Sequence, residues 1–151
     1  MIRIISVGSK NEPWIQEGIG HYQKRLKPPF DIEWILLNSK AKDSARARQI
    51  DSQTILSLID KSDFVILLDE LGEQMTSMQL AGYLSDKFVN SFRVVFVIGG
   101  AYGVDSLMKQ RANKILSVSS FVLPHQLVRL LFTEQIYRVQ EISRNNPYHH
   151  D

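Results

Sequence analysis

Residues 116–129, which read LSVSSFVLPHQLVR, join the end of a predicted strand to the start of the last predicted helix. The apolar run over 115–118 is typical of a buried strand, and Pro124 suits the start of a helix whose pattern continues to about Ser143. Small and aromatic residues, 119–121, lie between the two. Ligands of open α/β sheets bind at the carboxyl ends of the strands, so this junction predicts a pocket wall, with an ordinary strand-to-helix turn as the alternative.

Five predicted strands alternate with five predicted helices along the chain. The strands cover residues 2–7, 32–37, 64–68, 93–98 and 115–118. Three local features are also predicted. Asn11 caps the first helix, residues 38–48 form a basic loop, and residues 69–72 form a turn. The alternation predicts an α/β fold, as a single domain of residues 1–151 with a mainly parallel sheet and helices on both faces.

Composition limits the classes of function. The chain has 151 residues, of which 44% are hydrophobic and 23% charged, as in globular domains. It has no cysteine and four histidines without ligand spacing, so we expect neither a thiolate nucleophile nor a bound metal. No apolar run is long enough to span a bilayer, and the amino end lacks the pattern of a signal peptide. We therefore expect a cytoplasmic protein without a membrane partner.

The charge is unevenly distributed. Residues 1–61 carry ten Lys and Arg against seven Asp and Glu, residues 62–105 carry two against six, and residues 106–151 carry six against three. Exposed cations gather at Lys24, Arg25 and Lys27 and again in the basic loop, at Arg46 and Arg48. Such a distribution suits a polyanionic partner such as RNA, and it also suits an ordinary solvated face.

The glycine-rich stretch 99–103, GGAYG, follows the fourth predicted strand. It lacks the lysine of a phosphate-binding loop, and no dinucleotide fingerprint follows the first strand. It suits a neutral nucleoside held by backbone groups between the apolar side chains of Leu68, Phe121 and Leu123, with a tight turn as the alternative. If the third, fourth and fifth strands are neighbours, their carboxyl ends form one crevice.

Four motifs together resemble one family. They are VFVIGGAYG at 95–103, the opening stretch with its LPHQLVR, EQIYR at 134–138 and NPYHH at 146–150. This combination is similar to the RlmH family, the knotted SPOUT-class methyltransferases of bacterial large-subunit ribosomal RNA. The resemblance covers the whole chain. It implies a trefoil knot in the carboxyl-terminal half, and methylation of N3 of a pseudouridine in a 23S rRNA stem-loop on the assembled ribosome.

The same resemblance implies S-adenosylmethionine as the methyl donor and assigns its contacts to the three predicted strand ends. The implied cofactor residues are Leu68, Gly99, Val118, Ser119, Ser120, Phe121, Val122 and Leu123. It also implies a homodimer in which each subunit completes the partner's site. The last helix agrees, because its apolar residues cover most of its circumference; a wholly internal helix would show the same pattern.

Five side chains are candidates for handling the imino proton of the base: His125, Arg129, Arg138, Tyr148 and His149. A helix amino terminus disfavours protonated imidazole, so we expect a neutral His125 that shapes the pocket. Arg129 lies on a polar stripe of the last helix. Arg138 has Glu134 at i, i+4 spacing, so a surface ion pair is the alternative for it. Tyr148 and His149 lie in a tail expected to order over the substrate.

Three other functions are possible. One is a SPOUT methyltransferase that modifies tRNA or a different rRNA nucleotide. Another is a non-catalytic ribosome-binding protein, which would not bind S-adenosylmethionine. The third, a nicotinamide-dependent oxidoreductase, lacks its fingerprint. The sequence does not identify the general base, the residues that contact RNA or the role of His150.

Overall fold

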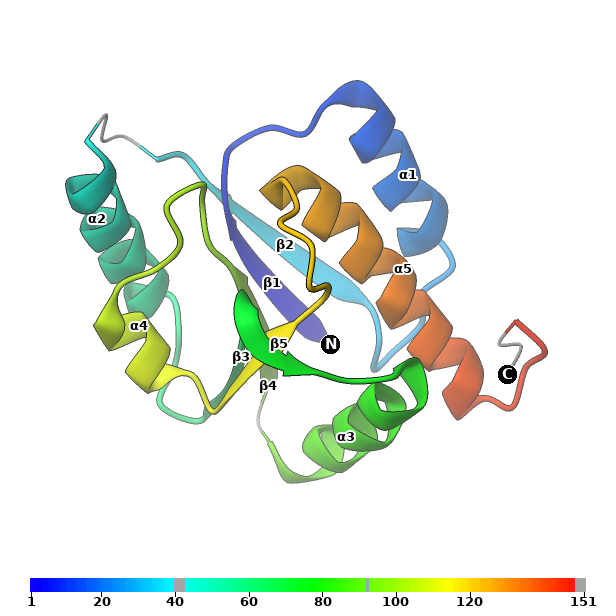
Figure 1. Ribbon diagram of the computed structural model, residues 1–151. Coiled ribbons are helices and arrows are strands. Elements are labelled where there is room, and N and C mark those ends of the chain that lie inside the picture. Colours follow the sequence, from blue (N-terminus) through cyan, green and yellow to red (C-terminus); the bar gives the residue numbers. More distant parts are fainter. Residues whose placement is uncertain (40–42, 92, 149–151) are drawn as a thin grey trace.

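The computed structural model describes residues 1–39, 43–91 and 93–148. Helices flank a central sheet, and the chain alternates between the two kinds of element (Figure 1). The elements in chain order are β1 (Ile2–Val7), α1 (Pro13–Gln23), β2 (Ile32–Leu37), α2 (Ser44–Ser57), β3 (Asp63–Gln74), α3 (Ser77–Asn90), β4 (Arg93–Ile98), α4 (Ser106–Arg111), β5 (Lys114–Ser117) and α5 (His125–Ser143).

The sheet has the strand order β2-β1-β4-β3-β5, and every neighbouring pair in this order is parallel. The predicted α/β class with a parallel sheet is therefore confirmed. Strands β4, β3 and β5 are neighbours, so their carboxyl ends meet at one edge of the sheet, as the crevice hypothesis requires. The trefoil knot stays a prediction.

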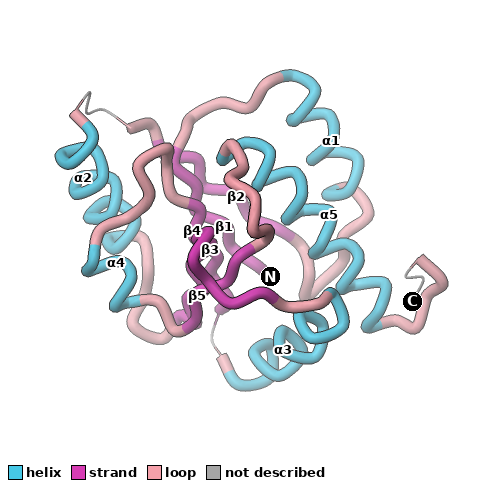
Figure 2. Tube along the Cα trace, viewed as in Figure 1, coloured by secondary structure: helices cyan, strands magenta, loops and turns pink. Residues whose placement is uncertain are grey.

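Helices cover both faces of the sheet (Figure 2). Each face has its own hydrophobic core. Along β4, Val94 and Phe96 pack on one face, whereas Val95 and Val97 pack on the other, as the period of two in a strand dictates. The first core includes α3 and α5, and the second includes Ile55 and the short helix α4. Strands buried on both faces explain the continuous apolar runs in the sequence.

Strand β3 is longer than predicted. The turn expected at residues 69–72 is wrong, because β3 continues to Gln74. Its pairing with β5 shifts register between Leu68 and Glu73, and the intervening residues bulge at the carboxyl edge of the sheet. A Cβ on Gly72 would lie 2.4 Å from the backbone carbonyl carbon of Leu116, so only glycine permits this close approach of the two strands.

Two local predictions near the amino-terminal half are also wrong. The basic loop is shorter than expected, because α2 begins at Ser44 after a side-chain cap from Asp43 and so includes Arg46 and Arg48. Helix α1 begins after Glu12 without a side-chain cap, and the expected cap, Asn11, instead accepts a hydrogen bond from Arg129. In both cases a side-chain hydrogen bond, rather than the residue type or composition from which the boundary was predicted, decides the local structure.

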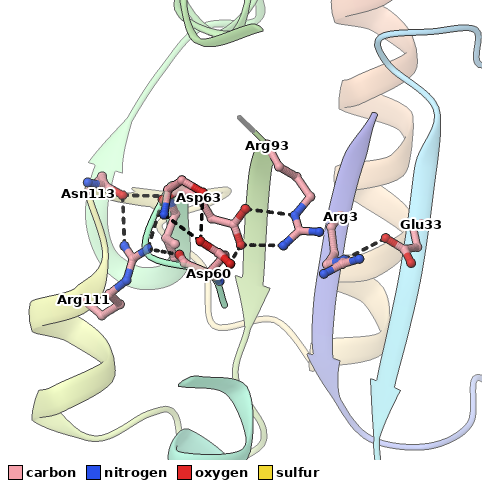
Figure 3. Close-up of polar contacts among 9 residues, drawn as sticks. Arg3, Glu33, Asp60, Asp63, Arg93, Arg111 and Asn113 are labelled. Carbon is pink, nitrogen blue, oxygen red and sulfur yellow. Dashed lines mark hydrogen bonds and ion pairs between the residues drawn. The ribbon is translucent and has the colours of Figure 1, made fainter. Parts of the chain in front are cut away.

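The amino edge of the sheet is closed by a polar cluster (Figure 3). The Asp63 side chain is fully buried and accepts two hydrogen bonds from the Arg93 guanidinium, at 2.7 and 3.0 Å. Arg3 donates to Glu33 at 2.7 Å, and Arg111 donates to the backbone carbonyls of Asp60 and Asp63. Paired charges at this edge contrast with the glycine-rich carboxyl edge, where the cavity described below opens.

Candidate active site

A cavity of about 860 Å³ lies at the carboxyl ends of β3, β4 and β5. It is lined by the bulge of β3, the glycine turn 99–103, the segment 117–124 and the first turns of α5. Because these strands are adjacent and parallel, three loops that are far apart in sequence converge here. The volume lies within the usual range of small-molecule sites.

The structure brings together seven of the eight residues predicted for the cofactor, and their role stays a prediction. Those that line the cavity are Leu68, Gly99, Val118, Ser119, Phe121, Val122 and Leu123. The eighth, Ser120, lies outside the lining and accepts a hydrogen bond from Gln74 of β3 at 3.1 Å. Segment 117–123 is held in a tight turn, because the Ser119 hydroxyl accepts the backbone N–H of Phe121 at 2.9 Å.

The cavity walls fit a nucleoside such as S-adenosylmethionine. Phe121 and Val122 are each 82% exposed, so a bound ligand would cover apolar surface that is now open to solvent. Leu68 and Val118 provide further apolar wall. The carboxylate of Asp69 lies in the same lining but is paired with Lys109 at 3.1 Å, so the fit rests on the apolar walls and the glycine turn. The residues present therefore fit this cofactor.

His125 lies at the start of α5, half-buried, and its side chain lines the cavity. Burial lowers the pKa of the imidazole below its usual value, and the nearby charge of Arg129 lowers it further. The imidazole is therefore neutral at pH 7, as expected, with burial as the main cause. Gly8 lies beneath it with φ +114°, and a Cβ there would come within 3.0 Å of the His125 ring.

Arg129, one turn further along α5, is fully buried, and all five of its guanidinium N–H groups have acceptors. No carboxylate is among these acceptors, which all belong to the end of β1 and the loop after it. They are the Ser6 hydroxyl (2.8 Å), the carbonyls of Val7 (2.7 Å), Gly8 (2.9 Å) and Lys10 (3.4 Å), and the Asn11 side chain (2.6 Å). Arg129 thus fixes the β1–α1 loop against α5.

Arg138 and Tyr148 lie together near the carboxyl end of α5. Arg138 donates two hydrogen bonds to Glu134, at 2.7 and 3.1 Å, so the ion pair considered as the alternative is present. The guanidinium also lies 5.0 Å from the centroid of the Tyr148 ring. Burial and the charge of Glu134 raise the pKa of Tyr148 to about 12, so its hydroxyl is protonated at pH 7.

The four candidate catalytic residues that the structure describes therefore form two separate groups. His125 and Arg138 are thirteen positions apart in one helix, which corresponds to about 20 Å at 1.5 Å per residue. Within one chain, the described candidates at the carboxyl end of α5 cannot reach the cavity at its amino end. His149, the fifth candidate, lies outside the described residues.

A family model described as "Predicted SPOUT methyltransferase" matches residues 1–149. The chain belongs to the SPOUT methyltransferase family. Proteins named ribosomal RNA large subunit methyltransferase H are similar over nearly their whole length: 40% identical in Paraburkholderia phytofirmans (98% of this chain, 97% of the relative), 37% in Parabacteroides distasonis (99% of both) and 36% in Neisseria meningitidis (99% of both). The predicted family is confirmed.

Sequence reasoning missed several residues that line the cavity of this SPOUT family member. Lys109 of α4 pairs with Asp69 at 3.1 Å across the cavity rim, and Arg48 of α2 also lines the cavity. Asp69 could have been found from its position directly after a buried strand. No sequence pattern indicates Lys109 or Arg48, because the packing of α4 and α2 brings them to the carboxyl edge of the sheet.

Neither a metal-binding cluster nor a membrane-spanning helix occurs within residues 1–39, 43–91 and 93–148. No three His, Asp or Glu side chains there lie close enough together to hold a metal ion. No helix within those ranges combines the length and apolar character needed to cross a membrane.

Proposed function

We propose that this protein transfers a methyl group from S-adenosylmethionine to N3 of a pseudouridine in a 23S rRNA stem-loop, on the assembled ribosome. In this proposal residues 1–151 act as one domain in a cytoplasmic homodimer. The supporting observation is the cavity in which seven predicted cofactor residues meet, in a chain of the SPOUT methyltransferase family. The relatives' names, which specify large-subunit ribosomal RNA, support the substrate class.

The residues of the cavity have distinct roles in this proposal. S-adenosylmethionine supplies an electrophilic methyl group on its sulfonium when it is bound. Leu68, Val118 and Phe121 would hold the apolar parts of the cofactor and exclude water. Gly99 lets the glycine turn close on itself beside the cavity, because a Cβ there would lie 3.2 Å from Gly103 and Val104. Arg129 acts as a positioning residue, because its guanidinium is wholly committed to the β1–α1 loop that lies against His125.

Groups at the other end of α5 contact the imide of the base, and His125 at the cavity end accepts its proton. Tyr148 keeps its proton at physiological pH, because its pKa is about 12. Its hydroxyl donates to Glu134 at 3.3 Å, and in this proposal it exchanges that acceptor for the base rather than removing a proton. Arg138 stabilises the negative charge that develops on the imide, because its guanidinium is fixed in place by Glu134. Neutral His125 shapes the cavity and is available as a proton acceptor.

Two subunits are needed because these groups and the cavity are about 20 Å apart in one chain. Helices α1 and α5 pack against each other. Apolar side chains that remain exposed on this pair of helices support a homodimer. Trp14 is 59% exposed and Leu131 is 38% exposed, and both would be buried in such an interface. Arg138 and Tyr148 of each subunit would then complete the cavity of the other.

The test combines cofactor binding with methyl transfer. Calorimetric titration with S-adenosylmethionine should detect binding, and labelled methyl groups should pass to assembled ribosomes but not to tRNA or free 23S rRNA. Mass spectrometry of nuclease digests should locate the label on N3 of a pseudouridine. Transfer to tRNA would favour another RNA methyltransferase. Absence of cofactor binding by the folded protein would favour a non-catalytic ribosome-binding protein.

A truncation isolates the contribution of the tail. Removal of residues 146–151 deletes Tyr148 but leaves the cavity at the amino end of α5 intact. We expect methylation to be lost and the affinity for S-adenosylmethionine to change less than twofold. Full activity of the truncated protein would contradict the assigned role of the tail.

A further inference from the structure

A basic segment follows α1 on the surface near the carboxyl end of α5. The side chains of Lys24, Arg25 and Lys27 are exposed. The ion pairs formed within residues 1–39, 43–91 and 93–148 include none of these three cations. Three neighbouring positive charges without an acidic partner create a local positive potential.

The backbone of this segment is fixed to α5 by one buried side chain. Gln140 is fully buried, its carbonyl oxygen accepts the backbone N–H of Lys27 at 2.6 Å, and its amide donates to the backbone carbonyl of Arg25 at 3.2 Å. A buried amide that makes both bonds is committed to this position. The cations therefore project from a backbone held at a defined place on α5.

Aromatic rings continue the surface from the basic segment to the tail. Tyr137 of α5 lies 5.8 Å from Tyr22 of α1 and 4.9 Å from Tyr148, measured between ring centroids. The guanidinium of Arg25 lies 5.9 Å from the Tyr137 centroid. All three tyrosines are partly exposed, and an open depression of about 650 Å³ borders Tyr137 and Tyr148. Planar groups of this kind are platforms on which nucleobases stack.

The charge of this region favours a polyanion. Lys24, Arg25, Lys27 and Arg138 provide four positive charges, and the carboxylates beside them are those of Glu134 and Glu141. Glu134 is engaged by Arg138, whereas Glu141 accepts hydrogen bonds from the neutral amides of Gln140 and Asn146. The region keeps an excess of positive charge. Exposed rings beside lysines suit bases and phosphates of unpaired RNA, because duplex RNA keeps its base faces stacked.

We propose that a basic–aromatic surface, formed by Tyr22, Lys24, Arg25, Lys27, Tyr137 and Tyr148, binds the single-stranded RNA nucleotides that flank the methylated base. Lysine ammonium groups contact the phosphates, and the tyrosine rings stack on the bases. The surface adjoins Arg138 and Tyr148, which the proposed function assigns to the target base, so the inference rests on that function. It extends the RNA site from the tail across α5 to the end of α1.

The first test separates RNA binding from cofactor binding and from turnover. The double variant Lys24→Ala/Lys27→Ala should bind assembled ribosomes about 25-fold more weakly at 0.1 M salt, about fivefold for each rRNA phosphate contact removed. The slope of log affinity against log salt should fall in magnitude by about 1.4, since each single-strand contact contributes about 0.7. Affinity for S-adenosylmethionine and kcat should stay unchanged. Lys61 is an exposed cation between α2 and β3, so Lys61→Ala is the control and should bind RNA normally.

A second pair of variants tests stacking. Tyr137→Leu keeps apolar packing but removes the ring, and should weaken RNA binding about tenfold, whereas Tyr137→Phe should retain it. Native affinity and native salt slope in Lys24→Ala/Lys27→Ala would overturn the inference, and so would failure of the native protein to bind the RNA. If the native protein binds RNA through this surface but transfers no methyl group, the proposed function fails and the surface assignment stands.

Discussion

The two ends of α5 carry similar residues in opposite surroundings. At the amino end, His125 lines the cavity and Arg129 is fully buried, with its guanidinium fixed by five neutral acceptors. At the carboxyl end, Arg138 and Tyr148 lie at the surface around Glu134 and border an open depression. In the proposed function, this one helix therefore carries two half-sites, with the cofactor at its amino end and the substrate base at its carboxyl end.

The largest expected effect comes from filling the cavity. Gly99→Arg should abolish binding of S-adenosylmethionine and methyl transfer, because its side chain would occupy the cavity beside Gly103 and Val104, whose atoms lie 3.2 Å from an added Cβ. Calorimetry and a methyl-transfer assay measure both losses. Gly82→Arg on the exposed face of α3, where a Cβ meets nothing within 4 Å, is the control. It should bind normally and gain up to about 1 kcal/mol of stability from helix propensity.

Arg129→Met should have the next largest effect, on stability. It leaves buried acceptors at the end of β1 without donors, and we expect the free energy of unfolding to fall by roughly 3 kcal/mol or more. Urea denaturation measures this difference. A loss below about 1 kcal/mol, the value typical of partly exposed ion pairs, would mean that the two arginines do not differ in their roles.

Arg138→Gln should reduce activity and leave stability nearly unchanged, in contrast to Arg129→Met. Its ion pair with Glu134 is partly exposed, so we expect the stability to change by less than about 1 kcal/mol. Methyl transfer should fall about 100-fold in kcat, because the charge that stabilises the developing anion is lost. Affinity for S-adenosylmethionine should stay within a factor of two. Weakened binding of S-adenosylmethionine would contradict the assignment of Arg138 to the substrate side of the site.

The smallest effect concerns His125. Its pKa is lowered in the folded protein, so the unfolded chain binds a proton first as the pH falls below about 6.5. The free energy of unfolding should therefore decrease from pH 7 to pH 5, and His125→Gln should lose less stability over this interval. NMR titration of the imidazole follows the same group directly. A pKa at or above 6.5 would contradict the burial described for this side chain.

The elements of the fold were largely predictable because strands buried on both faces require continuous apolar runs. The crevice followed from the carboxyl ends of β3, β4 and β5. The extension of β3 to Gln74 was not predictable, because its polar residues pair with β5 only after a bulge that depends on Gly72. The start of α2 was missed because its first turn depends on a cap from Asp43 rather than on apolar spacing.

The candidate site was predictable only in part. The sequence indicates that Arg129 lies on a polar stripe of α5, but whether that stripe faces inward depends on acceptors near residue 8, about 120 positions away. Arg138 occurs in the same helix and differs only in its surroundings. Lys109 and Arg48 reach the cavity through the packing of α4 and α2, which no local pattern records.

The central claim is that the two half-sites of one chain work with those of a second chain, and mixing two inactive variants tests it most directly. Gly99→Arg and Arg138→Gln chains, co-expressed with different tags and purified as the mixed dimer population, should regain about one quarter of native methyl transfer. Half of the dimers then pair unlike chains, and each of these has one intact composite site. A mixture that forms such dimers but shows no more activity than its two parents would contradict the claim.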